Sequence, residues 1–320
     1  MNKKNISFLK SILLTSFGTF LLAELFFAFI YFFIINIIQF AQIFAISLFS
    51  SGFGANSEIF QPLTVIIFGI GLILISIITF IEIATIIAIT VYDYYRDDHI
   101  PLKSLVYFVF DRLKKIFNWK ILPIFVFILL LPKEHIGASG LYNLEIPPFI
   151  MDGILQNSLY LSIFIVFVLF IIIFVYKSLF LIHILILEKN DNIFSAFAKS
   201  FSFTKQVGFY SILKLNIKAI YFSFIAIVCI FLFFSLFEIF IIYCFGFLGN
   251  FLVFLLTIIN YLENFLFFAV PGVILFSLLS FFYIDKNDFS ENRFFKLFNF
   301  ASNPKCNIYH KKGNIGKYSK

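Results

Sequence analysis

The chain has 320 residues, of which 62% are hydrophobic and 13% charged, and it carries a formal net charge of +7 at pH 7. Its mean hydropathy is +1.02. A water-soluble domain of this length is about 25% charged and cannot bury so much apolar surface, which excludes soluble enzymes and soluble binding modules. Apolar stretches long enough to cross hydrocarbon recur along the chain, so the sequence predicts an all-α integral membrane protein.

The apolar runs predict a polytopic membrane helix bundle with six transmembrane helices. Pro62, Pro132 and the turn at 246–250 separate these runs, and the first run continues to about Phe49, which favours one long tilted helix over two spans. The predicted spans are residues 12–36, 63–91, 117–131, 158–187, 219–244 and 251–283. We expect residues 1–285 to form the membrane domain and residues 286–320 to form a basic cytoplasmic tail.

The basic residues predict the orientation of these spans. Of 24 Lys and Arg residues, 22 lie before the first span, after the last, or in the alternate segments from Arg96 to Lys120 and from Lys189 to Lys218, and the two exceptions are Lys133 and Lys177. The positive-inside rule then places both termini in the cytoplasm and requires an even number of spans. The positive net charge therefore indicates a cytoplasmic membrane surface and not a nucleic-acid partner. We expect a multi-pass membrane protein with both termini in the cytoplasm.

Two of the predicted cytoplasmic connections contain amphipathic helices. In the segment 98–119, Leu105, Val109 and Leu113 share one helical face, and in the segment 190–213 the apolar stripe begins at Phe194. Asn190 or Asp191 is the expected N-cap of the second helix. Both are predicted to lie in the inner interface, with basic residues among anionic lipid headgroups. The expected headgroup contacts are Arg112, Lys114, Lys115, Lys120, Lys199 and Lys205.

Charged side chains inside predicted spans are candidates for function, because a charge near the bilayer centre is costly unless it is paired or hydrated. These candidates are Glu24, Glu82, Lys177, Glu238 and Glu263. Glu24 and Glu82 lie closest to mid-span, and either acid is a candidate ion-pair partner for Lys177. A substrate or ion pathway requires such groups to converge. The alternative is that these charged side chains pair with one another for structural reasons, or that they extend their charged ends to the membrane–water interface.

Signatures of enzymes and metal sites are absent from the sequence. It has no phosphate-binding Gly-rich loop, no H-E-x-x-H and no G-x-S-x-G motif. The three cysteines have no metal-ligand spacing, and the four histidines are scattered over different predicted sides of the membrane. We therefore expect no cofactor and no metal.

One segment interrupts the apolar pattern between the third and fourth predicted spans. Residues 129–150 read "LLLPKEHIGASGLYNLEIPPFI", in which a proline ends the span and a double proline ends the interruption. The composition of this segment fits either an ordered loop on the outer side of the membrane or a shallow re-entrant loop. The segment resembles the outer-loop signature of the glycerophosphodiester phosphodiesterase membrane domain of low-GC Gram-positive bacteria. The matching residues include Pro132, His135, Ile136, Gly137, Ser139, Ile146, Pro147 and Phe149.

The resemblance implies a non-catalytic membrane module, since the family's hydrolytic barrel follows the membrane domain. That barrel opens with an H-R-G stretch, to which "NIYHKKG" around His310 is only loosely similar. We expect the chain to act as a membrane anchor or as a domain that interacts with lipid or with a partner protein. We also expect it to be a truncated or split member of the family. A separate glycerophosphodiesterase catalytic chain is then an expected partner. The competing hypothesis is a small transporter or permease that uses Glu24, Glu82 and Lys177.

Overall fold

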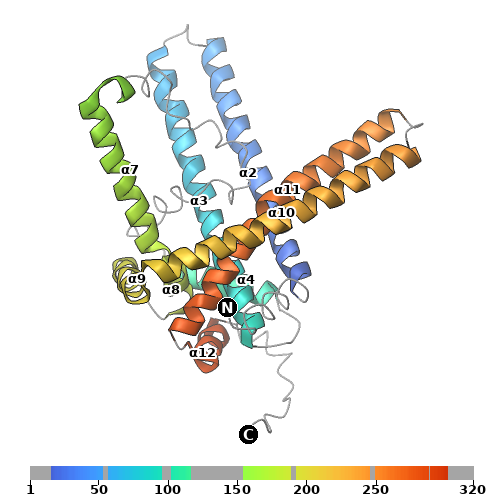
Figure 1. Cartoon of the computed structure of the whole chain (residues 1–320). Coiled ribbons are helices and arrows are strands. Elements are labelled where there is room, and N and C mark those ends of the chain that lie inside the picture. Colours follow the sequence, from blue (N-terminus) through green and yellow to red (C-terminus); the bar gives the residue numbers. More distant parts are fainter. Residues whose placement is uncertain are drawn as a thin grey trace.

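The computed structural model describes residues 16–52, 57–95, 102–116, 154–188, 192–245, 249–287 and 289–301. Every regular element in these ranges is a helix, so the all-α prediction is confirmed (Figure 1). The helices are α2 (Phe17–Gly52), α3 (Ser57–Tyr95), α4 (Leu102–Ile116), α7 (Ser158–Ser178), α8 (Leu181–Leu187), α9 (Ile193–Val207), α10 (Phe209–Phe245), α11 (Asn250–Lys286) and α12 (Glu291–Ala301).

Five helical stretches in the described ranges are long and apolar enough to cross a membrane. They are Phe17–Ala41, Gly69–Tyr95, Ser158–Leu187, Phe209–Phe245 and Phe251–Lys286. These stretches correspond to five of the six predicted spans and make the chain a multi-pass membrane protein. The predicted span at 117–131 lies outside the described residues, so the count of six stays a prediction.

Several helix boundaries differ from those predicted, each for a local reason. The span predicted at 158–187 is divided into α7 and α8, because the Leu179 N–H bonds back to the Tyr176 carbonyl and tightens the turn. Helix α10 begins ten positions before the predicted residue 219. Gly208, with a φ of 81°, separates α9 from α10, a backbone conformation that glycine adopts without strain.

The hydrophobic core lies at one end of the bundle. There the last turns of α3 and α11 enclose α8, all seven residues of which are buried. A helix that is apolar all round needs such a surrounding. The buried hydroxyls of Thr79, Thr85 and Thr90 donate to carbonyls four residues earlier in α3, which satisfies their donor hydrogens within the helix. Away from this end, the helices expose their apolar side chains, as lipid-facing helices do.

The two predicted amphipathic helices exist as α4 and α9, and both pack on the core. The buried face of α4 contains Leu105, Val109 and Leu113, as predicted. The prediction for α9 was wrong in two respects. Its N-cap is Asn192, whose side chain accepts from the Phe194 N–H at 3.1 Å. Phe194 itself is 55% exposed, because the buried face is a different stripe that includes Ile193, Ala196 and Phe203.

Helix α12 belongs to the packed bundle, although its residues were assigned to a cytoplasmic tail. Phe294 is fully buried, and its ring lies 5.9 Å from that of Phe108 on α4. The Tyr95 hydroxyl at the end of α3 donates to the Phe289 carbonyl just before α12. The Ser16 hydroxyl, before α2, donates to Asp93 on α3. The described start of α2 and the end of α12 therefore lie on the same side of the bundle (Figure 1).

Candidate functional site

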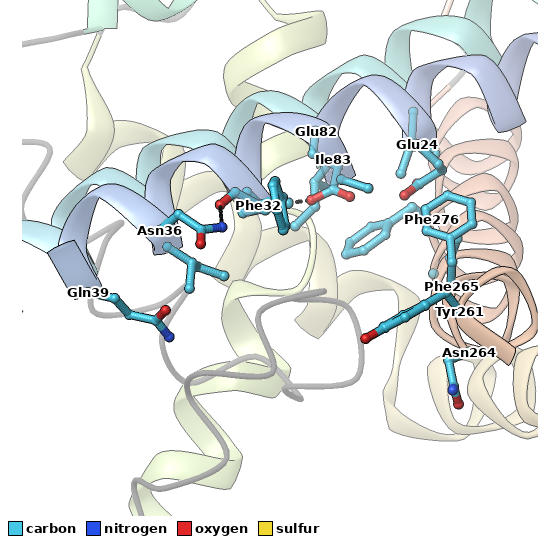
Figure 2. Close-up of a pocket in the computed structure, with 16 residues that line it drawn as sticks. Glu24, Phe32, Asn36, Gln39, Glu82, Ile83, Tyr261, Asn264, Phe265 and Phe276 are labelled. Carbon is cyan, nitrogen blue, oxygen red and sulfur yellow. Dashed lines mark hydrogen bonds between the residues drawn. The ribbon is translucent and has the colours of Figure 1, made fainter. Parts of the chain in front are cut away.

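A cavity of about 670 Å³ lies between α2, α3 and α11, within the candidate spans. Its α2 wall includes Glu24, Ala28, Tyr31, Ile35 and Gln39. These positions recur at steps of three or four residues, so they share one helical face. Glu82, Ile83 and Ile86 line it from α3, and α11 contributes a third stripe between Tyr261 and Phe276. Figure 2 shows these walls.

Two of the predicted acids meet in this cavity. Glu24 and Glu82 are 7% and 6% exposed, and their carboxyl groups lie in hydrogen-bonding contact with each other. Two adjacent carboxyl groups cannot both be ionised in a desolvated site, so the pair holds a shared proton. The predicted ion pair of one acid with Lys177 was wrong, because Glu24 has Glu82 as its neighbour.

The Glu82 carboxyl group is also linked to two hydroxyl groups, those of Tyr31 and Thr79. Tyr31 Oη lies 2.6 Å from Glu82 Oε2 and 2.8 Å from Thr79 Oγ1. Thr79 already donates its single hydrogen to the Ile75 carbonyl at 2.9 Å. The Tyr31 hydroxyl lies between two acceptors, with its hydrogen available to the Glu82 carboxyl group and to Thr79. These three contacts link Glu82 to Tyr31 of α2 and to the Ile75 carbonyl of α3, and so hold the acidic pair in place.

The remaining lining combines aromatic rings with neutral polar side chains. Phe32, Phe265 and Phe276 are among the aromatic residues, and Asn36, Gln39 and Asn264 are the carboxamides. Among the lining residues that the structure describes, none is Lys, Arg or His. The cavity is therefore amphipathic, with an acidic pair and no cation on its described wall.

The other predicted intramembrane charges lie elsewhere. Lys177 is in the last turn of α7, where its Nζ lies 5.6 Å from the centroid of the Tyr176 ring. Glu238 on α10 and Glu263 on α11 are close enough to interact electrostatically, and neither is a lining residue. Of the five predicted candidates, the cavity therefore brings together Glu24 and Glu82.

A second polar cluster, here called the Glu188 cluster, joins four elements at the core end. Glu188 Oε2 lies 2.7 Å from Lys199 Nζ on α9 and 3.9 Å from an Arg293 nitrogen on α12. Its Oε1 accepts from the Tyr283 hydroxyl on α11 at 2.6 Å. Burial acts to raise the pKa of Glu188, but the hydrogen bonds from Lys199 and Tyr283 and the nearby cations outweigh it, so its pKa lies below the ordinary value.

This cluster changes the interpretation of two predicted lipid contacts. Arg112 is 3% exposed, and its guanidinium donates to the carbonyl oxygens of Leu185 and Glu188 at the end of α8. It therefore caps α8 inside the protein and does not face headgroups. Lys199 is bound to Glu188 but keeps 49% of its side chain exposed. Lys114 and Lys205 are exposed on the same end of the bundle.

Several predicted residues have no structural test. The outer-loop motif, from Pro132 to Phe149, lies outside the described residues, as do Lys120 and the side chain of Lys115. In the ranges that are described, no group of three His, Cys, Asp or Glu side chains is arranged to hold a metal ion. His183, in the core, lies 3.1 Å from the Ser280 hydroxyl through Nε2.

Sequence reasoning missed Tyr31, the carboxamides of the cavity and Glu188. The signal for the first group was present, since Tyr31, Asn36 and Gln39 follow Glu24 at spacings that keep polar groups near one face of an apolar helix. Glu188 gave no such signal. An acid beside Lys189 at the end of a span is typical of a solvated helix end, and only the fold brings Tyr283 and Arg293 to it.

A comparison with protein families matches residues 3–313 to the family described as "Membrane domain of glycerophosphoryl diester phosphodiesterase". The match covers nearly the whole chain. A search of curated proteins and a search of solved structures gave no match.

Proposed function

The chain belongs to the family of the membrane domain of glycerophosphoryl diester phosphodiesterase, and from this premise we propose that it is a non-catalytic membrane module that binds a lipid-like molecule between its helices. It is also proposed to present its core end, on the cytoplasmic side of the plasma membrane, to a separate glycerophosphodiesterase catalytic chain. The observation that carries the proposal is the amphipathic cavity between α2, α3 and α11.

The dimensions of the cavity support a ligand of this kind. Small-molecule pockets have volumes of about 300–1,000 Å³, and 670 Å³ lies within that range. The lining residues on α2 extend from Glu24 to Gln39, and those on α11 from Tyr261 to Phe276. Each stripe covers about 22 Å along its helix at 1.5 Å per residue. An elongated, mostly apolar site with polar groups suits a molecule with a chain and a headgroup.

The experiment compares lipids that co-purify with the wild-type chain and with Ala269→Leu, which adds bulk to the lining. Ala198→Leu is the matched control, since Ala198 is exposed on α9. We expect one class of amphiphile to be retained by the wild type and the control, and to be lost from Ala269→Leu. Equal lipid content in all three proteins would contradict the proposal. Hydrolysis of a glycerophosphodiester by the purified chain would contradict its non-catalytic part.

The second candidate function is transport, which the acidic pair in the cavity favours. The described geometry supports this hypothesis for Glu24 and Glu82, whereas Lys177 lies on α7, outside the lining. Proteoliposomes that contain the chain and take up a labelled solute in a Glu82-dependent manner would favour transport over a binding module. Uptake equal to that of empty liposomes would favour the module.

The proposed contact with a catalytic chain is based on the arrangement of the core end. Lys114, Lys199 and Lys205 are exposed there, and α12 joins the same end. A partner that acts on lipid-derived diesters needs to approach the membrane surface at such a place. Cross-linking of a co-expressed glycerophosphodiesterase to cysteines introduced at Lys114 and Lys205 tests this contact. Cross-links that form equally well at Tyr243, at the far end of α10, would contradict it.

A further inference from the structure

We propose that the cavity between α2, α3 and α11 binds the positively charged ammonium group of an amphipathic molecule. This inference rests on the proposed function and adds the charge class of the ligand to it. It comes from the lining itself: a buried carboxyl pair, aromatic faces and no basic residue among the described lining residues.

The sign of the charge is the first argument. The carboxyl groups of Glu24 and Glu82 are the only acidic groups among the described lining residues, and no described basic residue of the lining offsets the negative charge that the pair acquires on losing a proton. Glu24 and Glu82 are 7% and 6% exposed, so a negative charge on the pair is poorly solvated and attracts a cation strongly. A phosphate or other anion at this place would meet the same carboxylate without a Lys or Arg partner on the described wall.

The aromatic residues are the second argument. In Figure 2, Phe276, Phe265 and Tyr261 of α11 lie on the same side of the cavity as Glu24. The face of an aromatic ring attracts ammonium groups within about 6 Å of its centroid, most strongly where water is excluded. A carboxylate combined with aromatic faces is the usual environment for alkylated ammonium groups. Uncharged polyols gain little from the rings.

The length of the cavity is the third argument, because it favours an ammonium group that is attached to an apolar chain over a bare ammonium ion. Apolar residues such as Ile35, Ile83 and Ile86 continue the lining beyond the acids. At its other polar positions, Asn36, Gln39 and Asn264 offer neutral donors and acceptors. A ligand that fills this space carries an apolar portion besides its charged group. Such an ammonium group belongs either to a lipid headgroup or to a free amphipathic amine.

The test uses the purified full chain in uncharged maltoside micelles and measures binding by native mass spectrometry. The probes share a fourteen-carbon chain and differ in headgroup: trimethylammonium, phosphocholine and phosphate. We expect both ammonium probes to bind at least about 10-fold more tightly than the alkyl phosphate, since a tenfold ratio corresponds to one charge-assisted contact. Tighter binding of phosphocholine identifies a lipid headgroup as the source, and tighter binding of trimethylammonium identifies a free amine. Equal binding of all three probes overturns the inference.

Variants connect that binding to the cavity. Glu24→Gln combined with Glu82→Gln should weaken the ammonium probes by about 10- to 100-fold, because a charged partner is lost. The matched control is Glu238→Gln with Glu263→Gln, which removes two intramembrane acids outside the lining and should leave affinity unchanged. Equal losses in both double variants overturn the inference. The headgroup series needs only the wild-type chain, so it still tests the inference if a variant does not fold.

The outcome also separates this inference from the proposed function. Lipid that co-purifies with the wild type but not with Ala269→Leu would support the lipid-binding module. If the headgroup series then shows no preference for ammonium, only the proposed charge of the ligand is wrong. If no lipid co-purifies and no probe binds, the proposed function fails together with it.

Discussion

The Nζ atom of Lys199 lies 2.7 Å from Oε2 of Glu188, so the acid at the end of α8 is joined to α9 by a charge-assisted hydrogen bond. The same carboxyl group accepts from Tyr283 on α11 and faces Arg293 on α12. One side chain therefore connects four helices at the core end. Its charge state should be visible in the stability of the whole domain.

The first prediction concerns pH. The pKa of Glu188 is lowered in the folded protein, so its contribution to stability is present above the ordinary value of 4.5 and is lost as the pH falls through the folded pKa. We expect Glu188→Gln to lower stability at pH 7 by about 1–3 kcal/mol, as for a buried charged hydrogen bond. The loss should shrink as the pH falls through the lowered pKa of Glu188. Melting curves in maltoside measure it, with exposed Glu291→Gln as the control. A pH-independent difference would contradict the prediction.

The second prediction concerns the cavity hydroxyl. Tyr31→Phe removes the group that joins Glu82 to Thr79 and leaves a buried carboxyl without that partner, so we expect a loss of about 1–3 kcal/mol. Tyr261→Phe is the control, since Tyr261 also lines the cavity but is 73% exposed. It should change stability by less than about 0.5 kcal/mol. The measurement is thermal unfolding in maltoside. Equal losses of stability in the two variants would contradict a stabilising role for the hydrogen bonds of Tyr31.

The third prediction concerns α12. Phe294→Ala removes a fully buried ring from the cluster with Phe108 and Phe298, and such truncations cost about 3–5 kcal/mol. Hydrogen exchange of residues 291–301 should become faster before that of α3 does, because α12 lies at the edge of the core. Phe201→Ala, at a position 37% exposed on α9, is the control. Unchanged protection of α12 would show that its docking does not depend on Phe294.

The fourth prediction concerns anionic lipid. Lys114, Lys199 and Lys205 are proposed to contact headgroups, each worth about 1 kcal/mol near an anionic surface. Hydrogen exchange of residues 102–116 and 193–207 should be slower in anionic than in zwitterionic bilayers. Lys114→Gln should reduce the difference in the first segment. Arg112→Gln should instead accelerate exchange in both lipids, since Arg112 caps α8. Equal protection in the two bilayers would mean that the exposed lysines contribute to topology alone.

The fifth prediction concerns the transmembrane topology. Reporter fusions after Phe53, Gly140 and Leu248 are expected to report the outer side, and fusions after Lys103, Lys199 and Lys317 the cytoplasm. The fusion after Gly140 tests the span predicted at 117–131. A cytoplasmic signal there would remove that span and the even count that depends on it.

The sequence was sufficient to predict five of the spans and the amphipathic helices α4 and α9, because these are properties of one stretch of chain at a time. It did not predict α12, whose apolar face is defined only by its packing on α4. It located Glu24 and Glu82 through the same local signal, an acid in an apolar run. It did not predict their pairing with each other, since opposite charge favoured Lys177 and only the packing of α2 on α3 decides which side chains meet. Arg112 was misjudged for a similar reason: a basic residue on an inner helix looks the same whether it faces headgroups or caps a neighbouring helix.

Helix α10 has 37 residues, which is a rod of about 55 Å, whereas the hydrocarbon of a bilayer is about 30 Å thick. Its partner α11 is equally long, and Figure 1 shows the pair inclined to α2 and α3. Such long helices fit a bilayer by tilting, and the tilt angle depends on membrane thickness. Because α11 is also a wall of the cavity, a thinner or thicker bilayer should widen or narrow that space. Acyl-chain length is therefore expected to regulate ligand affinity mechanically, without any change in the headgroup.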